Sequence, residues 1–409
     1  MSVNVKLGKN TINGVESVKL EDATTTGLYH EFSLGLSGVY KITLNVDDSV
    51  VSIINIVQGK SLTANPYTPQ KNGNVFLGWT QTSGSTTTIT YPFTPNADVT
   101  LYAVWQTGYK CTVSNLGASS PSTVSFNKDI GFTLQGLGIE EVTKGTDTFI
   151  KIPTMYRKVN TVASSQITSF TISNANLDGT YSPYSCFLDE SGGLLPYILI
   201  GKYWNTNRNS CVSTSQTTVA TMTLATGRTK AKGRGTGYQL FDWQMQKLWQ
   251  DLIICFKETI NTNSGTAWTT DELGIYWGTQ YGWIDGVISG GGTWRFSYKP
   301  SEYVSLSATS DTIPISYNSA SYSEPTSSNQ IQKLGYDSNN QFFNYPSAVS
   351  SNSSYNSYYC DSFEYSSGNH PVRWGVGSAY ASAGAFLCYA IDIWSDNYGV
   401  RLCYRPISE

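Results

Sequence analysis

The chain has 409 residues and a formal net charge of −3 at pH 7. This length predicts two or three domains. Because the chain is slightly acidic and contains no cluster of Lys and Arg, it lacks the basic surface that nucleic-acid binding requires. Charged residues make up 13% of the chain, against about a quarter in typical domains. The surplus of Ser, Thr, Asn, Gly and Tyr is typical of β-rich adhesive and fibre proteins.

The beginning of the chain, residues 1–6, has neither the basic region nor the apolar region of a signal peptide. No apolar run approaches the length that a membrane span needs, so we expect no membrane insertion. The protein is then either cytoplasmic or leaves the cell by another route, such as assembly into a virus particle that lysis releases.

The seven cysteines are an odd number, widely spaced, and none forms a CxxC pair. Zinc and thioredoxin-type sites therefore have no support, and we expect free thiols in a chain that folds in a reducing cytosol. A Cys388–Cys403 bridge stays open, because both cysteines lie near the end of the chain. The two histidines, His30 and His370, are too few for a histidine-based metal centre, and we expect no cofactor.

Residues 1–37 alternate weakly between apolar and polar side chains, and Asn13-Gly14 between two such runs is a strong hairpin-turn signal. We predict a short β segment, either a simple leading hairpin or a mount that pairs with a neighbouring protein. Residues 38–106 form a second unit. It combines alternating strands, the prolines Pro66 and Pro69, a core sequence Gly73–Trp79 and the ending Asp98–Trp105.

The pattern of residues 38–106 resembles the Listeria–Bacteroides repeat, a small β-grasp-like module. The resemblance implies that Trp79 and Trp105 are core aromatics. It also implies a spacer or adhesive stalk of a cell-surface or secreted protein, without catalysis. Residues 107–136, rich in Ser, Thr and Gly, are either a linker or the leading strands of the next domain.

From residue 137 to residue 409 the pattern predicts one large domain, and the fold class of the chain is α+β. Residues 149–159 read as a strand pair broken at Pro153, and residues 196–203 read as an apolar strand. Apolar residues at helical spacing predict an amphipathic helix from Asp242 to Glu258, with Asp242 at its N-terminal cap. Residues 230–237 read as a Gly-rich loop before this helix. Residues 301–369, a long Ser/Tyr/Asn tract, read as a functional or disordered loop.

Four pieces of this domain occur in an order that resembles the C-type lectin fold, in its branch related to the formylglycine-generating enzyme. They are the strand at 196–206, the helix opening at Tyr238, the stretch Tyr281–Gly286, and the ending that runs from Arg373-Trp374 to Gly399-Val400-Arg401-Leu402. The resemblance covers residues 137–409. Within that branch, the arrangement is most similar to variable proteins of diversity-generating retroelements, which are often found on phage tail fibres.

In such proteins, mutagenesis at Asn-type codons rewrites a C-terminal variable region, which here corresponds to residues 373–404. These codons cannot produce Lys, Glu, Gln or Met, and none of the four occurs between Trp374 and Tyr404. The resemblance implies that Trp374, Trp394, Arg401 and Leu402, with several glycines, hold the backbone. It implies that the ligand-binding, exchangeable positions are Ala379, Tyr380, Ala381, Ser382, Tyr389, Ala390, Ile391, Asp392, Ile393, Ser395, Asp396, Asn397 and Tyr398.

Tyr380, Tyr389 and Tyr398 are the expected contact anchors, because tyrosine offers a large amphipathic area at low entropy cost. We expect them to face outward together, although each could equally be a half-buried surface aromatic. The resemblance implies a receptor-binding protein of a phage tail that binds a host-surface protein or glycan. Its N-terminal region would contact other tail proteins, and a homotrimer is the common state of tail fibres. The expected location is the virion or a bacterial cell surface.

Two alternatives stay open. The first is a bacterial surface adhesin with a fixed ligand site. The second is an oxidase of the formylglycine-generating type, but residues 377–383 contain no cysteine where that activity needs one of a close pair. Calcium binding of the lectin type needs a loop of the Glu-Pro-Asn type, and Ser323–Thr326 is the nearest approach to one in this sequence. Calcium also needs six to eight oxygen ligands, so we expect no calcium site. Asp271, Glu272 and Asp285 have no evident acid–base partner, so we expect no enzyme.

Overall fold

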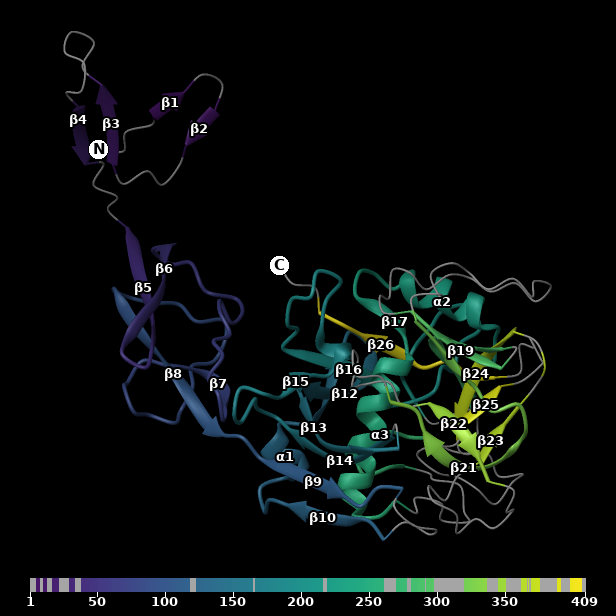
Figure 1. Cartoon of the computed structure of the whole chain (residues 1–409). Helices are drawn as coiled ribbons and strands as arrows, with labels where there is room; N and C mark the ends of the chain where they lie inside the picture. The colour runs from purple at the N-terminus through teal and green to yellow at the C-terminus, as the bar shows by residue number, and fades with distance from the viewer. Residues whose placement is uncertain are drawn as a thin grey trace. The chain divides into compact units, whose positions relative to one another are not determined.

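The computed structural model describes residues 5–7, 10–12, 17–21, 29–33, 38–117, 123–164, 166–215, 219–260, 270–277, 281–290, 292–297, 320–336, 345–350, 362–365, 367, 369–375, 388–390 and 398–406. The chain divides into two compact units. The first comprises residues 1–71 and 75–106, and the second comprises residues 72–74 and 107–409. Both are rich in strands, and the second adds a few helices (Figure 1).

The first strands of the chain form two separate hairpins. Strand β1 (Val5–Leu7) pairs with β2 (Asn10–Ile12), and β3 (Ser17–Glu21) pairs with β4 (Tyr29–Ser33). The predicted hairpin around Asn13-Gly14 is therefore wrong, because the strands on either side of it belong to different sheets. Each weakly alternating run pairs with its nearest downstream neighbour instead.

The four-stranded sheet of the first unit has the order β6-β5-β8-β7. Its strands are β5 (Val39–Val46), β6 (Ser49–Val57), β7 (Asn74–Thr80) and β8 (Val99–Thr107). Strands β5 and β6 meet in a two-residue turn, Asp47-Asp48, whose φ angles are 47° and 62°. Two successive positive φ values are the mark of a type I′ turn, which matches the twist of a hairpin. Strand β8 then returns parallel to β5.

The core of this sheet consists of Ile42, Leu44, Ile56, Trp79 and Leu101. The alternating pattern that predicted the strands also places these side chains on one face. The indole of Trp79 donates to Asn65 Oδ1 at 3.0 Å and to the carbonyl of Tyr67 at 3.1 Å. The prediction of Trp79 as a core residue is confirmed. Trp105 lies outside this core, half-buried between Phe76 and the ammonium of Lys71.

Residues 107–136 contribute strands to the second unit rather than a linker. Strands β9 (Lys110–Ser114) and β10 (Ser125–Lys128) join a five-stranded sheet of order β10-β9-β14-β13-β15, and α1 (Leu134–Leu137) follows. The remaining strands of this sheet are β13 (Tyr156–Ala163), β14 (Gln166–Ser173) and β15 (Ser182–Pro183).

A second five-stranded sheet has the order β11-β12-β16-β26-β17. It contains β11 (Glu140–Lys144), β12 (Asp147–Pro153), β16 (Tyr197–Gly201), β17 (Tyr238–Leu240) and the late strand β26 (Leu402–Tyr404). Both strands predicted on either side of Pro153 exist, but they do not pair. Strand β12 ends at the proline, and β13 belongs to the other five-stranded sheet.

Helix α3 (Trp243–Lys257) confirms the predicted helix, and the 3-10 turn η1 (Ser185–Phe187) and helix α2 (Leu224–Lys232) accompany it. Asp242 caps α3 by accepting the backbone N–H of Met245 at 2.9 Å. The predicted apolar face is buried, and the polar residues Gln244, Lys247, Gln250 and Asp251 are buried as well, so the helix exposes little of either face. The prediction for residues 230–237 is corrected in part, since residues 230–232 end α2.

The eight-stranded sheet has the order β20-β19-β18-β24-β25-β23-β21-β22. Four of its strands lie within residues 301–369, where a continuous loop was predicted. The few apolar residues of that tract, including Ile331, Leu334 and Phe363, are buried and are enough to seat short polar strands. The strands are β18 (Tyr281–Gly290), β19 (Thr293–Phe296), β20 (Ala320–Ser323), β21 (Asn329–Leu334), β22 (Pro346–Val349), β23 (Ser362–Glu364), β24 (Asn369–Gly375) and β25 (Cys388–Ala390).

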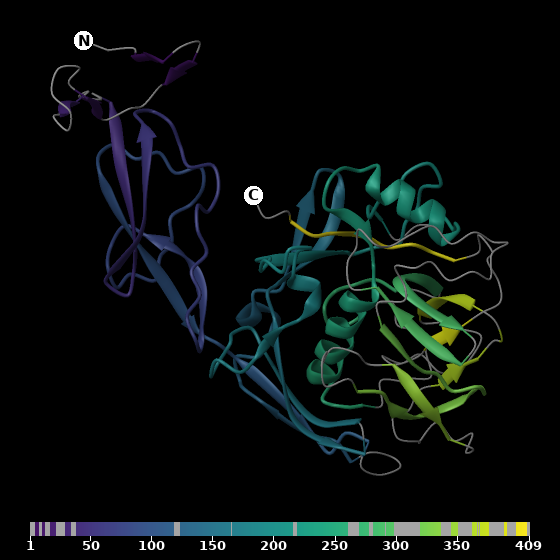
Figure 2. The ribbon, with the colours of Figure 1, turned by 45° about the horizontal axis from the view of Figure 1, so that its top comes forward.

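Helix α3 occupies the interior of the second unit, with strands on either side of it (Figures 1 and 2). One core cluster joins this helix to residues of all three large sheets, such as Ile172, Ile200 and Trp294. Among the described helices, none is both long enough and apolar enough to span a bilayer.

Candidate functional site

The two ends of the predicted variable segment meet at the first residues of β18. Gly375, at the end of β24, lies opposite Tyr281, and Gly399 forms a bridge with Gly282. The described residues on either side of the segment therefore lie beside the same strand. Within the segment the structure describes β25, which pairs with β24 and, in parallel, with β23.

The returning end of the segment is fixed by four successive backbone carbonyls. The carbonyls of Tyr398, Gly399, Val400 and Arg401 each accept an N–H from a different part of the domain. The donors are Met222 at 3.0 Å, Trp283 at 3.1 Å, Asn205 at 2.9 Å and Phe241 at 3.0 Å, respectively. Because each bond joins the chain to a separate element, the backbone of residues 398–401 is held in a single conformation.

Close packing on Trp204 explains two of the glycines. A Cβ atom on Gly282 would lie 2.2 Å from the indole of Trp204, which is well inside van der Waals contact. A Cβ atom on Gly399 would lie 3.0 Å from Val219 and 3.2 Å from the same indole. The strand β18 and the returning segment can approach Trp204 this closely only because these residues lack side chains.

Arg401 is fully buried and anchors the returning segment. Its guanidinium lies between two indoles, with its central carbon 4.1 Å from the ring centres of both Trp204 and Trp277. It donates to the carbonyls of Gly201 at 2.6 Å and Tyr276 at 2.8 Å. Burial lowers the pKa of Arg401 to about 9, so cation–π contacts and carbonyl acceptors replace the water around this charge.

Asp271 binds Trp277, one of these two indoles, together with Trp249. Its carboxylate accepts the indole N–H groups of Trp249 and Trp277, both at 2.7 Å, and the backbone N–H groups of Leu273 and Ile275, both at 2.9 Å. Burial raises the pKa of Asp271 to about 6, although these donors favour its charged form. Asp271, which has no evident acid–base partner in the sequence, therefore has a structural role.

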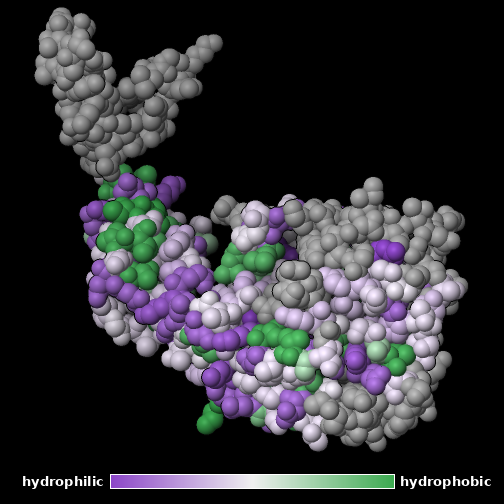
Figure 3. All heavy atoms as spheres, viewed as in Figure 1, coloured by the Kyte–Doolittle hydropathy of each residue, from purple (hydrophilic) through white to green (hydrophobic). Residues whose placement is uncertain are grey.

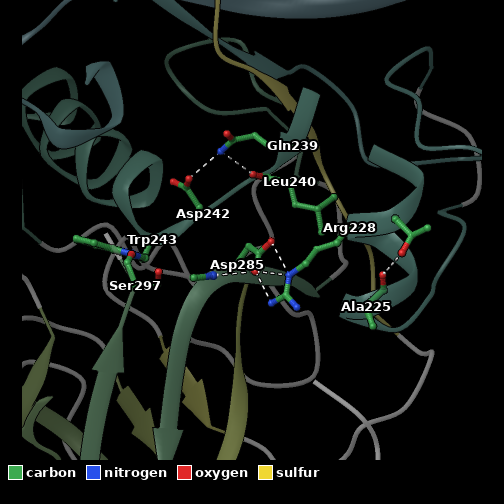
Figure 4. A network of polar contacts seen from close by, with 10 residues as sticks. Ala225, Arg228, Gln239, Leu240, Asp242, Trp243, Asp285 and Ser297 are labelled. Carbon is green, nitrogen blue, oxygen red and sulfur yellow. Dashed lines mark hydrogen bonds and ion pairs between the residues drawn. The ribbon is translucent and has the colours of Figure 1, made fainter. Parts of the chain in front are cut away.

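Asp285 lies in a bulge of β18, because the register against β24 shifts between Ile284 and Ile288. The bulge turns its carboxylate toward α2, where the guanidinium of Arg228 donates to both oxygens at distances from 2.5 to 2.9 Å (Figure 4). Asp242 likewise accepts Arg405 at 2.6 Å and Gln239 at 2.8 Å. These buried pairs connect β18 and the last residues of the chain to the two helices.

Of the predicted contact positions, the structure describes the surroundings of Tyr398 alone. Its ring is half-buried and meets Trp283 edge to face, with ring centres 4.8 Å apart. Tyr398 thus lies at the C-terminal end of the predicted variable segment, packed against β18. Tyr389 and Ala390 belong to β25, but their side chains lie outside the described set. The remaining predicted positions fall wholly outside it: Ala379, Tyr380, Ala381, Ser382, Ile391, Asp392, Ile393, Ser395, Asp396 and Asn397.

Cys403 is a free, buried thiol in β26, so it has no bridge to Cys388. Burial raises its pKa to about 12, which keeps the thiol protonated and unreactive. Glu272, another acidic residue considered for catalysis, pairs with Lys257 at 2.7 Å. No group of three His, Cys, Asp or Glu within the described ranges could hold a metal ion.

The residues that hold this end of the segment carry no local sequence signal as a group. Trp204 and Trp277 enclose Arg401 and Asp271 binds Trp277, yet all three come from distant parts of the chain and share no period with it. Gly282, between Tyr281 and Trp283, was the available signal, because a glycine inside a strand often marks a place where another part of the chain approaches closely.

Comparison with known families identifies one part of the chain. Residues 40–104 match the Listeria–Bacteroides repeat domain. This part of the chain is therefore a repeat domain of that type, which is typical of cell-surface proteins and points to a surface or adhesion-type protein. No curated protein matches the chain.

Proposed function

We propose that this protein attaches a virus particle to its host, through a C-terminal domain of the C-type lectin type that carries a diversified binding segment. The repeat domain serves as a spacer in this proposal. Residues 376–397, between the two anchored ends, provide the contact surface, and the ligand is a protein or glycan of the host surface. No catalytic step is part of the proposal.

The fixed return of the segment is the observation that carries this function. Four successive carbonyls from Tyr398 to Arg401 are bonded to four separate elements, and the side chains of Val400, Arg401 and Leu402 are fully buried. A binding surface that changes its side chains needs such a frame, because the fold must then not depend on the side chains that change. Rigid support also lowers the entropy cost of binding.

The segment itself has the composition of a recognition surface. Between residues 376 and 397 it contains Tyr, Ser, Asn, Asp and small residues, and it lacks Lys, Glu, Gln and Met. Tyrosine supplies contact area and Ser and Asn supply adaptable hydrogen bonds, as in antibody loops. Tyr380 and Tyr389 are the proposed anchors, with Tyr398 at their edge.

The N-terminal strands are the proposed connection to other particle proteins, and a trimer is one assembly that such a connection allows. A bacterial surface adhesin with a fixed site is the second candidate, because the repeat domain is typical of cell-surface proteins. The two candidates differ in one observable property, which is the distribution of sequence variation.

The test is deep sequencing of the coding region from one natural population. We expect differences concentrated in residues 376–398 at Asn-type codons, with Gly375, Gly399 and Arg401 unchanged. The gene should also lie near a reverse-transcriptase gene and a near-copy of this coding segment. Variation scattered evenly along the chain would contradict diversification and favour the fixed adhesin.

A binding experiment tests the role of the segment directly. Two full-length variants are compared with the parent for binding to host cells: Tyr380→Ala with Tyr389→Ala, and the control Tyr203→Ala with Tyr276→Ala at half-buried tyrosines outside the segment. We expect at least a ten-fold loss of affinity in the first and little change in the second. Equal binding by all three proteins would exclude this segment as the contact surface.

A further inference from the structure

Strand β6 forms an open edge of the repeat domain. Within the described strands, β5 is its only neighbour. The pairing runs from Val39 opposite Val57 to Leu44 opposite Ser52, and it shifts at Val51. Residues 52–57 are therefore a regular edge of the kind that proteins usually cover or interrupt.

The register decides which backbone groups point away from the sheet. The N–H of Gln58 donates to the carbonyl of Gly38 at 2.6 Å, so this pair is of the hydrogen-bonded type. In an antiparallel ladder such pairs alternate with the other type, so Ile56, Ile54 and Ser52 bond to β5. Ile53 and Asn55 then direct their N–H and C=O groups outward, to the free edge.

The side chains along this edge are uncharged, and most of them are apolar. The exposed fractions of Val51, Ile53 and Val57 are 43%, 50% and 58%, and no residue from Ser49 to Gly59 carries a charge. Hydrophobic residues, green in Figure 3, gather on the visible face of this domain. Natural edge strands usually carry a lysine, a proline or an inward charge that discourages pairing, and β6 has none of these between residues 49 and 57.

The opposite edge of the same sheet is different. Strand β7 is interrupted by Gly78, whose φ is 144°, and its Trp79 carbonyl accepts the N–H of Ile89 at 2.7 Å. A loop of the domain therefore covers that edge. Of the two edges of this four-stranded sheet, that of β6 is therefore the one that is open to pairing.

We propose that β6 pairs with β6 of a second copy of this chain, antiparallel and about a two-fold axis beside Ile54. Ile53 of one copy then lies opposite Asn55 of the other, and the four outward groups of each strand form two such hydrogen-bonded pairs. The two four-stranded sheets become one continuous sheet. The arrangement is isologous, so it closes as a dimer.

A second copy is the occupant that the strand itself favours. A two-fold rotation about Ile54 places the outward N–H and C=O groups of Ile53 opposite those of Asn55 in the other copy, so every group finds a partner without a shift in register. Ile54 of one copy meets Ile54 of the other at the two-fold axis, and cross-strand pairs of β-branched residues stabilise a sheet. Because the edge carries no charge, a charged foreign strand would find no counter-charge on it.

The first test measures the mass of the full-length chain in solution over a range of concentrations. We expect a dimer in equilibrium with monomer for the parent. Ile53→Lys places a charge on the edge, and Asn55→Pro removes an outward N–H that β5 does not use, so both should weaken dimerisation at least ten-fold. The control Leu77→Lys changes an equally exposed apolar residue on β7 and should leave it unchanged.

A cross-linking test fixes the register. A mixture of Ile53→Cys and Asn55→Cys chains should form a disulfide-linked pair under a mild oxidant, because residues in a hydrogen-bonded pair lie about 5.5 Å apart, within disulfide reach. Either chain alone should cross-link far less. A parent chain that is monomeric or trimeric at all concentrations, or a dimer that Ile53→Lys leaves intact, would overturn the proposal.

Discussion

The two units of this chain use different kinds of core. In the repeat domain, apolar side chains such as Ile42, Leu44 and Leu101 fill one side of a small sheet, and Trp79 supplies the polar contacts. In the second unit the interior contains charged groups, and Arg401 and Asp251 are fully buried. An apolar core follows from the alternation of apolar and polar residues along the strands. A charged core instead requires that distant segments supply hydrogen-bond donors and acceptors for each buried charge.

This difference bears on how each unit specifies its fold. Burying an unpaired charge is costly, so each buried charge requires its own arrangement of donors and acceptors. Such an arrangement fixes a single structure, and it leaves the remaining surface free to vary. The following predictions test this contrast, starting with the largest effect.

Replacing Arg401 by Met should lower the free energy of unfolding of the second unit by about 4 kcal/mol, because the carbonyls of Gly201, Lys202 and Tyr276 lose their donor inside the core. Differential scanning calorimetry should show the loss in one transition and leave that of the repeat domain in place. The exposed Arg208→Met is the control and should change neither transition. A loss below about 1 kcal/mol would show that the charge is not structural.

Leu44→Ala tests the apolar core of the repeat domain. Leu44 is fully buried in the repeat domain, and a leucine-to-alanine change in a core costs about 3 kcal/mol. Calorimetry should show this loss in the repeat-domain transition alone, while the exposed Leu77→Ala leaves it unchanged. A comparable shift of both transitions would mean that the two units unfold together.

The pH dependence of the second unit provides a smaller effect. Lys247 is buried beside Asp251 at 2.6 Å, and burial lowers its pKa from 10.5 to about 7. Between these values the unfolded chain binds a proton that the folded chain releases, so stability should rise as pH increases from 7 toward 10, by at most about 1.4 kcal/mol per pH unit.

Below pH 7 both states hold this proton, and the contribution of Lys247 no longer changes. Urea unfolding of the parent and of Lys247→Met at pH 7, 8 and 9 should show the rise in the parent alone. The variant leaves Asp251 paired with Arg157 and with the hydroxyl of Tyr184 at 2.7 Å, so its fold should be retained. Identical slopes for both proteins would rule out Lys247 as the titrating group.

The smallest predicted effect is a gain. Asp48 has a φ of 62°, in the left-handed region that glycine adopts without strain. Asp48→Gly should therefore raise the stability of the repeat domain by about 0.5 kcal/mol, measured as a higher midpoint in its own transition. Val46→Gly, inside β5, is the opposite control and should lower it.

Local pattern predicted much of the fold. The strands of the repeat domain follow from alternation, and helix α3 follows from its apolar spacing and from Asp242 at its cap. The burial of Lys247 and Asp251 did not follow, because helical periodicity assigns both to a solvated face. The strands within residues 301–369 were missed for a related reason, since isolated residues such as Ile331 and Phe363 form no recognisable period.

The candidate site was predicted as a segment within a frame; Arg401 and Leu402 are buried and Gly399 packs closely on Trp204, while their role as the frame of a variable segment stays a prediction. What the sequence could not supply is the set of partners. Trp204 and Trp277 contact Arg401 from segments more than a hundred residues away, and contacts of this range leave no mark in a local pattern. All of the exchangeable positions, Tyr398 included, stay a prediction.

The position of β26 has a consequence for how the protein is made. This strand lies between β16 and β17 inside its sheet, although it is formed by residues 402–404 and its partners, residues 197–201 and 238–240, are synthesised much earlier. On the ribosome, the sheet therefore stays incomplete until β26 emerges. Residues 376–397 precede β26 in the chain, so they are already part of the nascent chain when this sheet is completed.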